Sequence, residues 1–290
     1  MNPVGTPIPL LTLVAAILLT VVPMPDALAA GHRAMRARVG LERMVLVQVG
    51  GYYPDNQPML DVLAEEGDIA RGIAAYDPDV TAEDIAELNA AGARGMRVSP
   101  GRELSGDRMN EVWRIVTRLA LLFEPVGWHI QFLLSGHMRD ALLPRLADLP
   151  VPVVIDHLGL FRPERVVGHK GCEALLRLLE SDNAWLKVSG ADRVTRDGRY
   201  EDAIPLMQQY IAVAPDRLVW GTDWPHTPER PALARRGQGR APQDGLPFLH
   251  RPRALQLGPA ATRLRPEGGA RVRLTRAGKG GSGRTHVNGA

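Results

Sequence analysis

Two ionisable residues stand directly after apolar, strand-like runs of this sequence. Asp223 follows Val219 and Trp220 in VWGTDWPH, and His157 ends the run VPVVIDH. An ionisable side chain beside a buried strand needs a partner or a chemical task. A carboxylate there can take a proton from water, and an imidazole can donate a hydrogen bond to a carbonyl oxygen on which charge develops. Because no covalent nucleophile is evident near them, these residue types favour hydrolysis.

Further polar residues stand at or just after the ends of other strand-like runs. Arginines there can hold the carboxylates of an anionic substrate, so a small carboxylate-bearing molecule is the expected partner. The candidates for substrate binding are Tyr52, Arg97, Gln131, Arg193 and His226. Catalytic zinc takes three protein ligands, and only His157, Asp223 and His129 offer themselves in this part of the chain. We therefore expect no cofactor, with zinc or manganese as the alternative.

The candidate residues need a regular framework to bring them together. Strand-like runs alternate with helical patterns, and the runs are MVLVQV (44–49), ARGIAAY (70–76), RGMRVS (94–99), WHIQFLL (128–134), VPVVIDH (151–157), AWLKVSG (184–190) and LVWGTD (218–223). Several are apolar on both faces, which is typical of parallel strands covered by helices. The sequence therefore predicts an α/β fold, a (β/α)8 TIM barrel in which one strand is missing. The carboxyl ends of barrel strands share one rim, where the candidates should gather.

Several short motifs together carry a resemblance to a known family. VLVQ, ARGIAAYDPDVT, AAGARGMRVS, VVIDHLG, LKVSGADR and RLVWGTDWPHT resemble the amidohydrolase superfamily, in its amidohydrolase-related branch near 2-pyrone-4,6-dicarboxylate lactonase, from about Pro23 to about Arg230. The resemblance implies a distorted TIM barrel that hydrolyses a lactone or similar ester. It implies Asp223 as the general base, His157 as a group that polarises the carbonyl, and Arg97, Arg193 and Arg102 as carboxylate-binding residues. It also implies metal-independent catalysis of the kind used in aromatic degradation, whereas other relatives use zinc or manganese.

The sequence departs from the family at its first strand, where an H-x-H pair is expected. No H-x-H occurs in this chain, and the apolar run Leu10–Val22 occupies the place of that strand. His32 is a poor substitute, since it lies in a basic helical pattern in which Arg33 and Arg36 should face solvent. A catalytically impaired barrel therefore stays open as an alternative to an active hydrolase.

The two ends of the chain differ in composition from its middle. We expect an atypical apolar segment over 1–22, a barrel domain over 23–230 and a disordered tail over 231–290. The tail holds about a dozen Arg and Lys against Asp244 and Glu267, so a basic-tailed nucleic-acid-binding protein is a further alternative. A reading-frame error would also produce such abrupt switches.

Composition limits the cell compartment and the partners. The single cysteine, Cys172, excludes an internal disulfide framework and is expected to be buried. The run Leu10–Val22 is too short for a comfortable membrane span and lacks a preceding basic residue. We expect a cytoplasmic protein, with export as the alternative, and neither membrane nor nucleic acid as partner. The oligomeric state does not follow from the sequence.

Overall fold

The computed structural model describes residues 29–49, 55–99, 107–134, 136–163, 168–195 and 200–225. Three of the candidate site residues, Tyr52, Arg102 and His226, lie outside these ranges, as do segments 1–22 and 231–290. The predictions made for them stay predictions.

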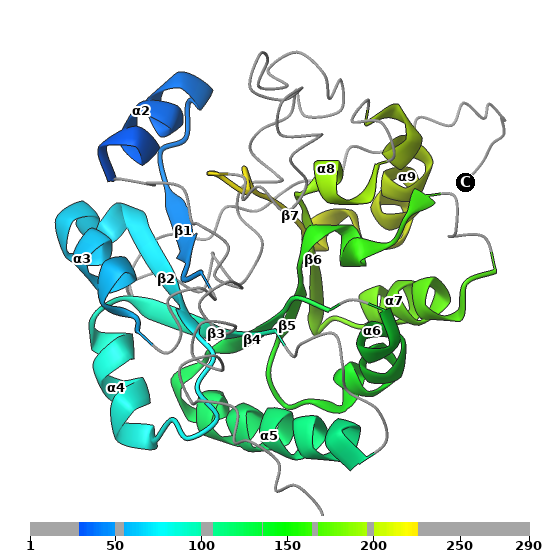
Figure 1. Ribbon diagram of the computed structural model, residues 1–290, viewed down its shortest axis with the longest axis horizontal. Helices are drawn as coiled ribbons and strands as arrows, with labels where there is room; N and C mark the ends of the chain where they lie inside the picture. Colours follow the sequence, from blue (N-terminus) through cyan, green and yellow to red (C-terminus); the bar gives the residue numbers. More distant parts are fainter. Residues whose placement is uncertain are drawn as a thin grey trace, which may run out of the picture.

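A seven-stranded parallel sheet forms the centre of the described chain, with its strands in sequence order. The strands are β1 (Met44–Val47), β2 (Ala70–Ala75), β3 (Ala93–Val98), β4 (His129–Phe132), β5 (Val153–Ile155), β6 (Ala184–Val188) and β7 (Leu218–Trp220). Each coincides with one of the seven predicted runs. The sheet curls into an incomplete barrel in which β1 and β7 are the two edges (Figure 1). The predicted TIM-barrel architecture is confirmed.

Helices follow most strands and cover the outer side of the curled sheet (Figure 1). They are α2 (Ala29–Val39), α3 (Gln57–Glu66), α4 (Ala82–Ala90), α5 (Asp107–Phe123), α6 (Gly136–Leu142), α7 (Lys170–Glu180), α8 (Ala191–Val194) and α9 (Ile204–Val213). Helix α4 begins with a capping box, in which Thr81 and Asp84 each accept a hydrogen bond from the other's backbone N–H. Local sequence therefore sets this boundary.

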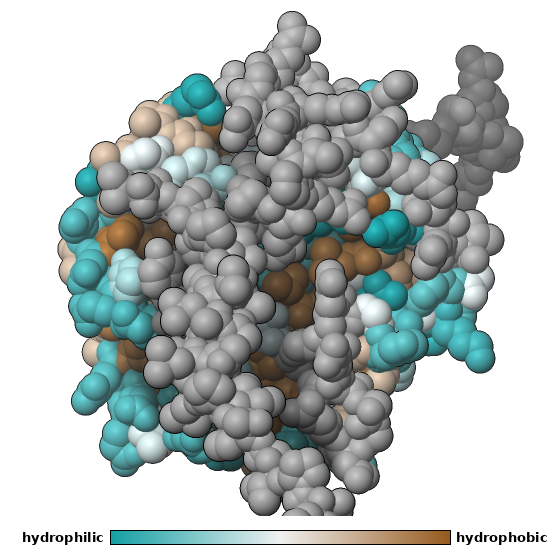
Figure 2. Space-filling model, viewed as in Figure 1, coloured by the Kyte–Doolittle hydropathy of each residue, from teal (hydrophilic) through white to brown (hydrophobic). Residues whose placement is uncertain are grey.

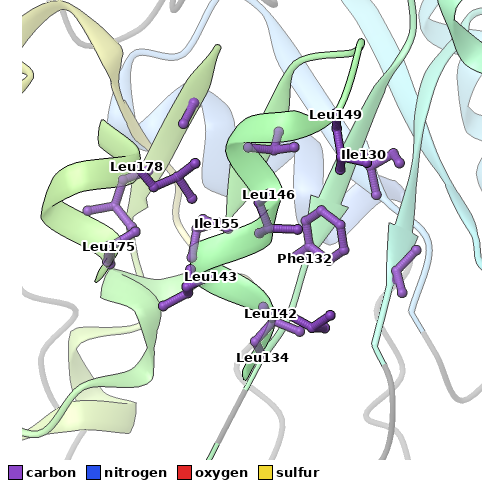
Figure 3. Close-up of a cluster of buried hydrophobic side chains, with 14 of the residues drawn as sticks. Ile130, Phe132, Leu134, Leu142, Leu143, Leu146, Leu149, Ile155, Leu175 and Leu178 are labelled. Carbon is purple, nitrogen blue, oxygen red and sulfur yellow. The ribbon is translucent and has the colours of Figure 1, made fainter. Parts of the chain in front are cut away.

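Alternation along the strands separates an apolar outer layer from a polar interior. Successive side chains of a strand point to opposite faces. Ile130, Phe132 and Ile155 pack outward against leucines of α6, α7 and the 3-10 turn η4 (Leu143–Asp148), as Figure 3 shows. The alternate positions hold polar residues, among them Gln131 and Lys187. The single cysteine, Cys172 on α7, is buried as expected.

Helix α2 connects the two edges of the sheet. The rings of His32 and Trp224, which follows β7, lie with their centroids 5.5 Å apart. The expectation that Arg36 faces solvent is wrong, because its side chain is only 13% exposed and lies 3.1 Å from Glu66 on α3. Arg33 is about half exposed and lies 3.0 Å from the same carboxylate. The acidic end of α3 thus attracts the basic face of α2.

The surface of the described helices is mainly hydrophilic around the rim of the view in Figure 2, and hydrophobic residues show nearer its centre. None of the helices in the described ranges combines the length and apolar character needed to cross a membrane.

Candidate active site

The structure brings His157 and Asp223 together at the carboxyl ends of β5 and β7. Nε2 of His157 lies 3.7 Å from Oδ1 of Asp223. Both residues have left-handed backbone conformations, with φ of 51° and 55° respectively. Such conformations are uncommon for residues other than glycine, and they concentrate at functional sites. Two strand ends far apart in sequence therefore turn their ionisable groups toward each other.

The backbone around His157 is held from outside the barrel. The 3-10 turn η5 (His157–Leu160) contains further left-handed residues, Leu158 and Leu160. The hydroxyl of Tyr210 on α9 donates to the carbonyl of Leu158 at 3.1 Å. Arg139 on α6 donates to the carbonyl of Leu160 at 3.0 Å. These donors satisfy carbonyls that no regular ladder would satisfy.

The end of β6 lies against the imidazole. Nδ1 of His157 and Oγ of Ser189 are 3.0 Å apart, and both side chains are buried. The next residue, Gly190, has a φ of 61°, and a Cβ there would stand 2.7 Å from Nδ1 of His157. Only glycine permits this approach.

Of the three arginines predicted to bind substrate, Arg97 and Arg193 lie in the described ranges, and both line the site. Nε of Arg193 donates to Oδ2 of Asp223 at 2.8 Å. Nη2 of Arg97 donates to the backbone carbonyl of Gln48, across the neighbouring strands, at 3.1 Å. Burial lowers the pKa of the Arg97 guanidinium, and Arg193 lowers it further, while Asp156 and Asp223 oppose the shift. Arginine stays cationic in proteins nonetheless, so both guanidinium groups contribute positive charge.

A buried polar cluster lies beneath these residues. Nζ of Lys187 is 3.1 Å from Oδ1 of Asp156 and donates to Oε1 of Gln131 at 2.6 Å. Nε2 of Gln131 donates to the other oxygen of Asp156 at 2.9 Å. Gln131, predicted to bind substrate, thus has both ends of its amide engaged by protein groups, and its contact with substrate stays a prediction.

The electrostatics of the site favour an anion and a neutral histidine. Burial lowers the pKa of His157, with Arg193 and Lys187 acting in the same direction against Asp156 and Asp223. Burial opposes ionisation of Asp156, yet Lys187, His157 and Arg97 together lower its pKa. The guanidinium groups and the Lys187 ammonium outnumber the two carboxylates, so the cluster carries a net positive charge.

The donors that the described residues place near the rim fall short of a set of three metal ligands. Among the described residues no group of three His, Cys, Asp or Glu side chains is placed to hold a metal ion. His157 and Asp223 supply two donors, and one oxygen of Asp223 already accepts a hydrogen bond from Arg193. His129 packs against Gly95 of β3, and burial lowers its pKa to about 4.

Comparison with known families identifies the chain. The family model described as amidohydrolase matches residues 14–246. The chain belongs to the amidohydrolase family. This membership confirms the resemblance drawn from the strand-end motifs and makes the protein a hydrolase.

Relatives of this amidohydrolase include hydrolases of lactones. It is 32% identical over 234 residues to the 2-pyrone-4,6-dicarboxylate hydrolase of Comamonas testosteroni, covering 76% of this chain and 72% of the relative. It is 30% identical over 204 residues to the 4-sulfomuconolactone hydrolase of Hydrogenophaga intermedia, covering 70% and 67%. An apo crystal structure from Agrobacterium tumefaciens superposes with a TM-score of 0.65 at 27% identity, covering 84% of this chain and 89% of that one.

Three residues of the amidohydrolase site were missed at the level of sequence. Asp156 precedes His157 directly, Lys187 lies within the apolar run AWLKVSG, and Ser189 ends that run. A lysine that breaks an apolar strand was the available signal, since alternation places Lys187 and Ser189 on one face. Their partners, however, come from other strands.

Proposed function

We propose that this amidohydrolase hydrolyses a small anionic lactone or carboxylic ester. The observation that carries the proposal is the approach of His157 and Asp223 to 3.7 Å at one barrel rim. An acceptor for a proton and a donor for a developing oxyanion are the two groups that ester hydrolysis by water requires. The lactone hydrolases among its relatives support the substrate class.

In the proposed mechanism Asp223 acts as general base. Its carboxylate takes a proton from water while the water oxygen attacks the carbonyl carbon of the substrate. His157 donates a hydrogen bond to the carbonyl oxygen, which becomes negative as the tetrahedral intermediate forms. The bond to the ester oxygen then breaks, and that oxygen receives the proton held by Asp223. The products are an alcohol and a carboxylic acid, which releases its remaining proton to solvent and becomes a carboxylate, and Asp223 is again ionised.

The positive charge of the site accounts for an anionic substrate. Arg193 donates to Asp223 through its Nε, and the planar fork of a guanidinium suits a carboxylate. Arg97 lies at the same level of the barrel, in register with Gln131 of β4. We assign both arginines to the substrate's carboxylates, with Arg102, Tyr52 and His226 as further predicted contacts.

Replacing Asp223 tests the proposal. Asp223→Asn should lower kcat by at least about a hundredfold, because asparagine is no general base. Binding of the lactone, measured by calorimetry on the variant, should persist, since the arginines remain. The matched control is Asp182→Asn. Asp182, like Asp223, pairs with an arginine, since it lies 3.3 Å from Arg217, but it is fully exposed and remote from the rim. Unchanged turnover by Asp223→Asn would refute the assignment.

We also propose that the reaction needs no metal, because the described donors supply only two ligands near the rim. Dialysis against a chelator should leave kcat unchanged, and added zinc or manganese should not raise it. Loss of activity on chelation that zinc or manganese restores would contradict this.

The absence of H-x-H from the chain keeps the catalytically impaired barrel as the second candidate. It predicts that lactones bind but are not turned over by the wild-type protein. The nucleic-acid-binding alternative rests on residues 231–290, outside the described ranges, and steeply salt-dependent binding of a DNA or RNA oligomer would support it.

A further inference from the structure

The imidazole of His157 has a different partner at each ring nitrogen. Nδ1 lies 3.0 Å from the hydroxyl oxygen of Ser189. Nε2 lies 3.7 Å from Oδ1 of Asp223. A neutral imidazole carries one proton, and the partners on the two sides decide which nitrogen holds it.

The Asp223 side favours a proton on Nε2. An ionised carboxylate only accepts hydrogen bonds, so a lone pair on Nε2 would face negative charge, whereas an N–H would be attracted to it. The separation of 3.7 Å is too long for a hydrogen bond. Therefore the Nε2 proton would face the rim without being bound to Asp223.

The Ser189 side agrees with the same tautomer. A hydroxyl can donate or accept, and it donates when its partner is an unprotonated ring nitrogen. In the described part of the chain, the hydroxyl of Ser189 makes its hydrogen bond with His157. Both side chains are nearly inaccessible, since Ser189 is 7% and His157 6% exposed. If Nδ1 carried the proton, the Ser189 hydroxyl would accept it and could not donate its own O–H to the ring. Burying a hydroxyl donor without an acceptor is costly, so the arrangement in which Ser189 donates to Nδ1 is favoured.

We infer that Ser189 is a positioning residue: its hydroxyl donates to Nδ1 of His157 and thereby holds the ring in the tautomer with its proton on Nε2. The inference rests on the proposed function, in which that proton stabilises the carbonyl oxygen. A ring of the opposite tautomer would turn a lone pair toward the oxyanion and could not act. Ser189 itself touches no reacting atom.

The neighbouring backbone is built for this contact. Gly190 has no Cβ, and a Cβ there would stand 2.7 Å from Nδ1 and 2.9 Å from Cγ of the imidazole. The left-handed conformation of Gly190 ends β6 at the ring and starts α8, which carries Arg193. One strand end thus sets the tautomer of His157 and delivers the arginine that binds Asp223.

Nitrogen NMR on protein with 15N-labelled histidine tests the inference directly. Proton–nitrogen correlation spectra distinguish a protonated from an unprotonated ring nitrogen, and the His157→Gln variant identifies the signals of this residue. The wild type should carry its proton on Nε2. Ser189→Ala should give a mixture of tautomers or the Nδ1 form, and Ser189→Thr, which keeps a hydroxyl, should restore the wild-type form.

Kinetics on the same variants give the second readout. Ser189→Ala should lower kcat about tenfold with little change in KM, because the lost hydrogen bond to His157 affects stabilisation of the transition state rather than binding of the substrate. Ser189→Thr should recover most of the rate. The matched control is Ser181→Ala, which removes a hydroxyl that donates to the carbonyl of Leu178 at 2.6 Å, at the far end of α7 from the site. It should leave both tautomer and kcat unchanged.

Two results would overturn the inference: a wild-type proton on Nδ1, or an Ser189→Ala variant with the wild-type tautomer and kcat. Failure of the proposed function has another signature, namely a wild type that turns over no lactone. In that case the NMR result still decides the tautomer.

Discussion

Lys187 carries a charge into the barrel interior at a considerable energetic cost. Burial lowers the pKa of its ammonium, and Asp156 opposes that shift from 3.1 Å away. Asp156 is 1% exposed, so each partner depends on the other for compensation. A buried ion pair is weak evidence for stability, because a well-packed apolar pair is often as stable. At His157 the two charges act against each other, since Asp156 raises the pKa of the imidazole and Lys187 lowers it.

A double-mutant cycle on this pair tests its energetics. Lys187→Met and Asp156→Asn should each lower the free energy of unfolding by about 3 kcal/mol, because each leaves an uncompensated buried group. The double variant should be more stable than the sum of the single changes predicts. Urea unfolding measures the free energy of unfolding of the two single variants and the double variant. Additive losses would show that the two groups do not compensate each other, and the exposed Asp182→Asn should change nothing measurable.

At the same scale, the sequence indicates some site residues and not others. Asp223 and His157 are predictable because each ends an apolar run, and a barrel gathers strand ends. The roles of Gln131 and Lys187 are harder to predict, because both residues lie in the middle of a strand. Gln131 on β4 and Lys187 on β6 contact each other, and Gln131 also contacts Asp156, which follows β5. Sequence spacing alone carries no information on such contacts.

At the scale of elements, strands are the most predictable parts. Each of the seven predicted runs overlaps a strand, because apolar periodicity and turn residues act locally. The turn η5 is not predictable in this way. Its left-handed residues are held by Tyr210, which is more than fifty positions away, and by Arg139. Arg36 was misjudged for a similar reason, since its partner Glu66 belongs to another helix.

At the scale of the whole molecule, an incomplete barrel surrounds two buried histidines. The pKa of His129 is lowered to about 4, first by burial and next by Lys187, while Asp156 opposes the shift. The pKa of His157 is also lowered, with burial as the largest cause. Both rings are therefore neutral in the folded protein at neutral pH. Below about pH 6.5 the unfolded chain takes up protons that the folded chain does not.

This difference predicts loss of stability in mild acid. A histidine whose pKa is lowered on folding contributes fully above its unfolded pKa of about 6.5, and the contribution is lost as the pH falls toward the folded value. For His129 alone the free energy of unfolding should fall by about 2 kcal/mol between pH 7 and about pH 5. The carboxylates with lowered pKa, Asp84, Asp156 and Glu66, titrate mainly below that window because their unfolded values are 3.8 for the aspartates and 4.5 for the glutamate.

Urea unfolding of the wild type and of His129→Gln at several pH values measures the effect. The variant should lose clearly less stability than the wild type on going from pH 7 to about pH 5, because glutamine does not titrate. His137→Gln, which changes an exposed histidine on α6, is the matched control and should keep the wild-type pH dependence. Equal slopes for His129→Gln and the wild type would mean that His129 does not resist protonation in the fold. The slope that remains in the variant belongs to His157 and the other titrating groups, so the same series bounds the contribution of the candidate active site to acid sensitivity.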